Sequence, residues 1–144
     1  MKLKLDLNHL EEDFFEGTSL LGIVAPMKDY QFCWQLNHAL QFDFRINNEL
    51  EIQLLKKERR YYFAVYQYQV PNCSLAHYMY NNQFDGEPLL PEFKHLDFIW
   101  LMKGDTIIPS QLSELIAGIR QINGVQLVTE LANEQIKHKK NLIF

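Results

Sequence analysis

The sequence is poor in the features that mark secreted, membrane and metal-binding proteins. Its 2 cysteines, Cys33 and Cys73, lack the short spacing of a zinc site. No apolar run approaches the ~20 residues that a membrane-spanning helix needs, and Lys2, Lys4 and Asp6 interrupt the leucines where a secretion signal would be continuous. We therefore expect a cytoplasmic protein with no membrane partner, no cofactor, and buried free thiols in place of a disulfide.

Positive charge is also scarce. The chain carries 14 lysines and arginines against 18 aspartates and glutamates, which gives a net charge of -4. Because clustered lysines and arginines drive binding to phosphate backbones, nucleic acid is not expected as the main partner. The basic run at residues 56–60, Lys-Lys-Glu-Arg-Arg, still raises a nucleic-acid hypothesis. The opposing interpretation, which we favour, is a solubilising hairpin tip.

Recognisable catalytic motifs are missing as well. There is no glycine-rich phosphate loop and no nucleophile elbow. Catalytic groups can converge from distant positions, so this absence does not exclude an enzyme. The 144 residues fit one domain, 1–144.

Two segments have the apolar periodicity of helices. The first begins at Asp29, a good N-cap, and runs through about residue 41. The second is opened by Pro109-Ser110 and closed by Asn123-Gly124. Their core stripes are Phe32, Cys33, Leu36, Ala39 and Leu40 in the first, and Leu112, Leu115, Ile116, Ile119 and Ile122 in the second.

The remaining apolar segments have the composition of strands. Predicted strands lie at residues 3–7, 20–25, 42–46, 50–55, 61–70, 75–80, 98–102 and 125–131, and residues 81–88 form a turn-rich loop. The run between residues 42 and 80 reads as an antiparallel meander. These patterns predict an α+β fold, a mainly antiparallel sheet of about six to eight strands with two principal helices packed on it.

The segment around residues 89–104 organises the chain. Residues 98–102 are apolar without alternation, which is typical of a central strand covered on both faces. Glu92 and Asp97 lie at its entrance, after Pro91. Structural roles are favoured for them, such as accepting backbone N–H bonds, but a site with His95 or His77 would supply a metal site or an acid/base pair.

These residues also carry a family resemblance. Leu90-Pro91-Glu92, followed three residues later by Leu96-Asp97-Phe98, resembles the signature of the IPExxxVDY family of small uncharacterised bacterial proteins. Residues 21–23 and 141–144 resemble the family too. The resemblance implies a fold and no mechanism, and Phe98 lacks the hydroxyl of the family's tyrosine. Separately, residues 98–131 resemble ferredoxin-like domains of the ACT type.

A second candidate surface lies on the first helix. Tyr30, Trp34 and His38 are four residues apart and form a ladder roughly opposite the core stripe. Either the N-terminal segment or a partner covers it. The apolar residues 142–144 are expected to dock on their own domain or on a neighbour.

Two functions follow from these surfaces. The first is a non-catalytic interaction module that self-associates, as a homodimer, through the ladder or the C-terminal residues. The second is an enzyme or small-molecule-binding protein with a site around Glu92, His95 and Asp97.

Overall fold

The computed structural model describes residues 11–144, so the strand predicted at residues 3–7 lies outside the described part. The predicted α+β class is confirmed by one mainly antiparallel sheet and two principal helices. In spatial order the sheet contains β10 (Leu127–Leu131), β1 (Ser19–Val24), β9 (Phe98–Lys103), β6 (Ala76–Asn81), β5 (Val65–Gln69) and β2 (Arg45–Ile46). The helices are α2 (Asp29–Leu40) and α3 (Pro109–Arg120), and residues 11–15 are also helical.

Smaller elements complete the chain. Two hairpins stand apart from the main sheet, β3 (Ile52–Lys56) with β4 (Arg59–Phe63), and β7 (Gln83–Phe84) with β8 (Glu87–Pro88). Single 3-10 turns are η1 (Asn48–Leu50), η2 (Pro91–Phe93), η3 (Asn133–Gln135) and η4 (Lys139–Leu142). No helix in the described residues is long and apolar enough to cross a membrane.

The strand order explains how two helices come to lie on one side of the sheet. Strands β1 and β6 flank β9, and strands β9 and β10 flank β1, with antiparallel pairing throughout. Helix α2 leaves β1, and α3 joins β9 to β10. Two interleaved units of this kind make up the split βαβ arrangement of ferredoxin-like folds. Residues 98–131 form one strand–helix–strand unit of this arrangement.

Strand β9 is the centre of the molecule. Phe98, Trp100 and Met102 face the helices, whereas Ile99 and Leu101 face the opposite side. All five side chains are buried. The prediction of a strand covered on both faces is thus confirmed, and the sheet needs two layers of cover.

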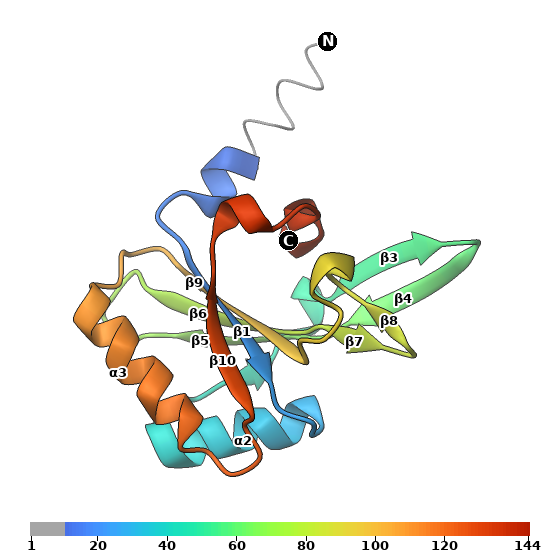
Figure 1. Ribbon diagram of the computed structural model, residues 1–144. Coiled ribbons are helices and arrows are strands. Elements are labelled where there is room, and N and C mark those ends of the chain that lie inside the picture. The colour runs from blue at the N-terminus through green and yellow to red at the C-terminus, as the bar shows by residue number, and fades with distance from the viewer. Residues whose placement is uncertain (1–10) are drawn as a thin grey trace.

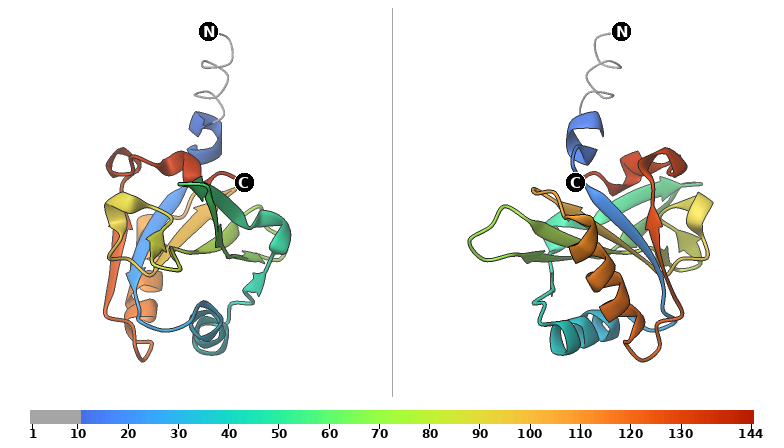
Figure 2. Two further views of the ribbon diagram at one scale, coloured as in Figure 1. Left: turned by 90° about the vertical axis from the view of Figure 1, so that its right-hand side faces the viewer. Right: turned by 60° about the vertical axis from the view of Figure 1, so that its left-hand side comes forward.

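The two helices form the first layer (Figures 1 and 2). Helix α2 buries Phe32, Cys33 and Leu36 against the sheet, and Ile119 does the same from α3. The predicted N-cap at Asp29 is wrong, because Lys28 occupies that position. The side chain of Gln31 instead accepts a hydrogen bond from the backbone N–H of Lys28, at 3.1 Å.

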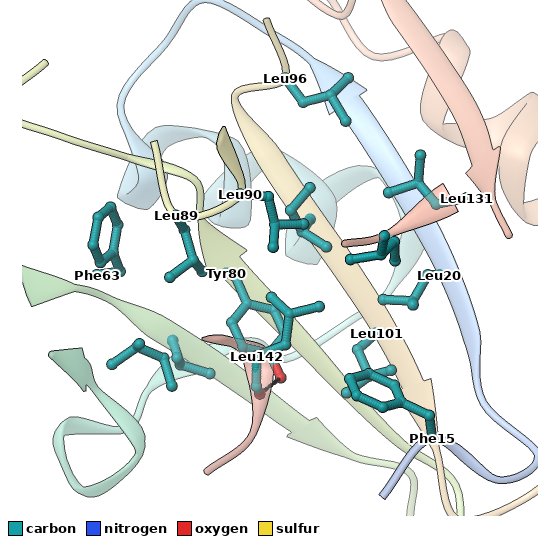
Figure 3. Packing of buried hydrophobic residues seen from close by; sticks show 14 of the residues in the cluster. Phe15, Leu20, Phe63, Tyr80, Leu89, Leu90, Leu96, Leu101, Leu131 and Leu142 are labelled. Carbon is teal, nitrogen blue, oxygen red and sulfur yellow. Dashed lines mark hydrogen bonds between the residues drawn. The ribbon is translucent and has the colours of Figure 1, made fainter. Parts of the chain in front are cut away.

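Within residues 11–144, the second layer has no long helix. Four separate pieces of chain cover the other face of the sheet, as Figure 3 shows for part of the cluster. They are the segment with Phe14 and Phe15, the β3–β4 hairpin with Ile52 and Phe63, residues 89–96, and the C-terminal segment with Ile136 and Leu142.

The predicted meander is interrupted. Residues 61–70 were expected to form one strand, but the chain leaves the main sheet at Ala64, so that β4 pairs with β3 and β5 pairs with β6. The carbonyl of Ala64 accepts a hydrogen bond from Asn81 at 2.9 Å, where the main ladder ends. Strand 42–46 shrinks to Arg45–Ile46, because Phe42 and Phe44 pack in an aromatic cluster with Trp100.

Two further expectations need correction. Residues 81–88 contain the hairpin β7–β8 in place of an open loop, and Asp85 and Gly86 turn the chain there with positive φ of 49° and 83°. Both cysteines are free, as predicted, but only Cys33 is buried and Cys73 is exposed.

The C-terminal segment docks on its own domain, one of the two predicted alternatives. Leu142 is fully buried, and its carbonyl accepts a hydrogen bond from the hydroxyl of Tyr80 at 2.6 Å. The ring of Phe144 lies 4.7 Å from Tyr78 and 5.2 Å from Phe14. The apolar residues of this segment are therefore largely used within the chain.

Gly22 in β1 tests the contact between the sheet and the second layer. A Cβ added there would lie 2.4 Å from Cδ1 of buried Leu96, so Gly22→Ala should destabilise the fold by about 1–3 kcal/mol. Combining it with Leu96→Ala makes room, and the double variant should lose less than the sum of the single losses by at least ~0.5 kcal/mol. Urea unfolding of all four proteins measures this. Additive losses would contradict the contact.

Candidate functional site

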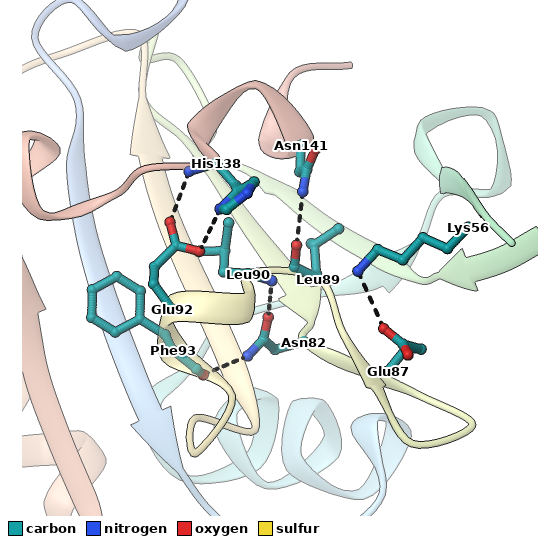
Figure 4. A network of polar contacts seen from close by, with 9 residues as sticks. All are labelled: Lys56, Asn82, Glu87, Leu89, Leu90, Glu92, Phe93, His138 and Asn141. Carbon is teal, nitrogen blue, oxygen red and sulfur yellow. Dashed lines mark hydrogen bonds and ion pairs between the residues drawn. The ribbon is translucent and has the colours of Figure 1, made fainter.

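A buried asparagine holds the segment at residues 89–97 in place. Asn82 is fully buried, and its amide nitrogen donates to the carbonyls of Phe93 at 3.0 Å and Leu96 at 2.8 Å. Its side-chain oxygen accepts from the N–H of Leu90 at 2.9 Å, and its backbone carbonyl accepts from Leu89 at 2.8 Å. Figure 4 shows part of this network. Every polar group of Asn82 is thus used to shape one turn of chain.

Sequence reasoning missed Asn82. Its position in a polar, turn-rich stretch suggested exposure. The neighbouring Asn81 and Gln83 are only partly buried, so the pattern contained no sign that Asn82 alone turns inward. Only the fold brings the carbonyls of Phe93 and Leu96 to it.

Asp97 ties the same segment to the end of β1. Its carboxylate accepts a hydrogen bond from the backbone N–H of Ala25 at 2.8 Å, and its own N–H donates to the carbonyl of Ile23 at 2.8 Å. Ala25 is fully buried. The carboxylate therefore continues the β1–β9 ladder past the point where the backbone pairing stops.

Glu92 ties the segment to the C-terminal residues. One carboxylate oxygen accepts from the backbone N–H of His138 at 2.7 Å, and the other lies 3.0 Å from Nδ1 of the His138 ring. Only 13% of the Glu92 side chain is exposed. Burial acts to raise the pKa of Glu92, but the hydrogen bonds from backbone N–H groups and from His138 together outweigh it and lower this pKa below its usual value.

The three candidate residues are not arranged as one reactive site. Glu92 and Asp97 bind different distant segments, and His95 is exposed, with its ring 6.3 Å from that of Phe93. His77 lies between the sheet and the helix layer, where it accepts a hydrogen bond from Trp100. Among residues 11–144 no group of three His, Cys, Asp or Glu side chains is placed to hold a metal. The arrangement suits a structural clasp, made by Asn82, Glu92 and Asp97, that joins the ends of β1 and β6 to the C-terminal segment.

His77 has a structural role of its own. Its Nδ1 accepts a hydrogen bond from the indole N–H of Trp100 at 2.9 Å. The ring is 4% exposed, and burial lowers its pKa to about 4. Aromatic rings of Phe42 and Tyr68 lie 5.0 and 6.0 Å away. Since Nδ1 is the acceptor, the neutral ring carries its proton on Nε2.

The ladder on α2 is the most exposed aromatic surface of the described residues. Tyr30 is 60% and Trp34 is 62% exposed. The rings of Trp34 and His38 stack, with centroids 4.9 Å apart and planes 11° from parallel. A hollow of about 580 Å³ lies beside the ladder, lined by Met27, Tyr30, Gln31, Trp34 and Gln35. No other segment within residues 11–144 covers these rings.

The ladder also lacks formal charge. Between Asp29 and the end of α2 at Leu40 there is no Asp, Glu, Lys or Arg. The exposed positions there carry aromatic rings, an amide, an imidazole and the methyl group of Ala39, which the sequence had wrongly placed in the core stripe. Depletion of charge together with enrichment of aromatic residues is the composition of the buried centre of protein interfaces.

The basic hairpin tip is partly neutralised by the neighbouring hairpin. Nζ of Lys56 lies 3.2 Å from a carboxylate oxygen of Glu87, and Arg59 pairs with Asp85. The guanidinium of Arg59 also lies over the ring of Tyr61. Residues 56–60 form the tip of the β3–β4 hairpin, as predicted.

The bond from Ala25 to Asp97 gives a stability prediction. Asp97→Ala leaves the buried N–H of Ala25 without its acceptor and should cost about 1–3 kcal/mol of unfolding free energy. Asp97→Asn keeps an oxygen acceptor in the same place and should retain most of the stability. Urea unfolding compares the two. Equal losses in both variants would show that this bond does not hold the segment.

His77 predicts a pH dependence. The unfolded chain binds a proton to this residue below pH 6.5, whereas the folded protein binds it only near pH 4. Stability should therefore be full above pH 6.5 and fall as the pH drops toward 4, by up to roughly 1.4 kcal/mol per pH unit from this group. His77→Asn keeps an acceptor for Trp100 without titrating, so its stability should fall less steeply. Identical slopes would contradict this prediction.

Comparison with known proteins adds no relative. The chain matches no family model, no curated protein and no solved structure. The resemblance of residues 90–98 to the IPExxxVDY signature therefore remains a prediction.

Proposed function

We propose that this protein is a non-catalytic interaction module that binds a second copy of itself through the α2 ladder, defined by Tyr30, Trp34 and His38. The observation that carries the proposal is the 62% exposure of Trp34 on an uncharged helix face. An exposed indole beside a hollow is the kind of anchor that dominates interface energies.

The spacing of the ladder favours a symmetric partner. Trp34 lies midway between Tyr30 and His38, one helical turn from each. When two α2 helices pack antiparallel about a two-fold axis, Trp34 meets its equivalent, and Tyr30 meets His38 of the other copy. The surface is thus complementary to itself, as an isologous dimer requires.

A catalytic function receives less support. Glu92 and Asp97 each have one carboxylate oxygen engaged by a backbone N–H group of another segment, and His95 lies apart from both bonds. A general base must reach the proton that it removes. These carboxylates instead form hydrogen bonds that hold distant segments of the chain together.

Membership of the IPExxxVDY family is also proposed. Its support is that the resembling segments touch one another. Asn141 donates a side-chain hydrogen bond to the carbonyl of Leu89 at 3.0 Å. The backbone N–H of Asp97 donates to the carbonyl of Ile23, and the side chain of Leu96 packs directly over Gly22. A structure of a family member in which these segments lie apart would contradict this. A cytoplasmic location is proposed as well, because an exposed free thiol such as Cys73 suits a reducing compartment.

Self-association predicts a mass that depends on concentration. Light scattering should give an average above the 17.1 kDa of one chain and rising with concentration. Trp34→Glu places a charge in the ladder and should lower that average. Ala39→Glu adds the same charge at an exposed position of α2 outside the ladder and should leave the mass unchanged. The proposal fails when the wild type and Trp34→Glu have the same mass at every concentration.

A further inference from the structure

Strand β3 has an open edge. Among the described strands it pairs with β4 alone. Lys57 and Glu58, which join the two strands, both have positive φ, 51° and 65°, as in the type I′ turn of tight hairpins. Residues flanking such a turn form a hydrogen-bonded pair, and bonded pairs then alternate along the ladder. The N–H and C=O groups of Gln53 and Leu55 therefore point away from β4.

These edge groups are available for pairing. In the described part of the chain no hydrogen bond uses the backbone of Gln53 or Leu55 on that side. Figure 1 shows the hairpin projecting from the body of the molecule, with β3 on its outer side. Leu55 is 69% exposed, more than any other large apolar side chain among residues 11–144. An open edge next to an exposed leucine is a template for another strand.

The charges along β3 select the strand that fits. Glu49 and Glu51 precede the strand, and Lys56 and Lys57 end it. A parallel neighbour of the same sequence would place like charges side by side. An antiparallel copy places the acidic start of each strand against the basic end of the other.

We propose that β3 pairs antiparallel with β3 of a second copy of this chain, about a two-fold axis at Leu54. Gln53 of one copy then lies opposite Leu55 of the other, and each such pair exchanges two backbone hydrogen bonds. Glu51 lies opposite Lys57 of the second copy, twice by symmetry. The two hairpins become one continuous sheet by strand addition.

A hollow lies where this pairing needs space. It measures about 390 Å³ and is formed by residues 49–54 and by Lys140, Asn141, Ile143 and Phe144. In the proposed register the turn of the second copy passes beside residues 50 and 51, at the mouth of this hollow. Lys140 on its wall offers a positive charge to Glu58 of the arriving turn.

This surface is independent of the α2 ladder. The ladder belongs to the helix layer, whereas the hairpin belongs to the opposite layer of the sheet. Each surface is isologous and has its own two-fold axis. The failure of one proposal therefore leaves the other standing, and each can be measured with the other disabled.

The test uses Trp34→Glu as the background so that only the β3 edge is measured. Sedimentation of this protein should give a dimer, about twice the chain mass of 17.1 kDa. Adding Glu51→Lys or Lys57→Glu sets like charges opposite each other, and either variant should sediment at the mass of one chain. An equimolar mixture of the two variants should return to the dimer, because each repulsive pair becomes attractive.

A second variant tests the backbone bonds without changing charge. Gln53→Pro removes an edge N–H that faces solvent in the single chain, so the fold tolerates it, and it should also give the mass of one chain. A background protein that stays at one chain mass at all concentrations overturns the proposal. So do charge variants that remain dimeric, or a mixture that stays monomeric.

Discussion

The central strand is apolar on both faces, so both faces of the sheet must be covered by other parts of the chain. Strand β9 sends Trp100 to one side and Leu101 to the other, and both are fully buried. The two helices cover one face only. The other face is closed partly by residues 89–97, a segment without a long helix or a ladder of its own, whose backbone groups lose water on burial. Asn82, Asp97 and Glu92 supply the missing partners, so the polar clasp is a consequence of the apolar strand.

The parts of the fold that follow a local period can be predicted from the sequence. The two helices are examples, because residues three and four apart in sequence lie on one face of a helix. Strand β9 is another, because its unbroken apolar run is typical of a strand covered on both faces. The break at Ala64, the inward turn of Asn82 and the hydrogen bond from the N–H of His138 to Glu92 could not be predicted in this way. Each depends on contacts between segments far apart in the chain. The α2 ladder was visible in advance because residues four apart align on a helix, whereas its exposure depends on tertiary packing.

The two proposed surfaces, each with its own two-fold axis, have a geometric implication for assembly. A single isologous contact closes on itself as a dimer, but two different ones link each copy to two neighbours. The assembly is closed when the two axes intersect at an angle equal to 180° divided by a whole number, of which a right angle is the simplest case, and otherwise it grows as an open chain. The orientation of α2 relative to the β3–β4 hairpin, fixed by the sheet between them, decides between these outcomes.

The strand order also dictates when the fold can be completed during synthesis. Strand β1 is among the first described segments to be made, yet its two neighbours in the sheet are β9 and β10. Strand β1, with Leu21 and Ile23, therefore has no strand partner until residues 98–131 have been translated. Pairing over such sequence separations is slow, and unpaired apolar strands invite aggregation in the meantime. The earliest strand of the sheet is thus the segment for which a chaperone would be most useful.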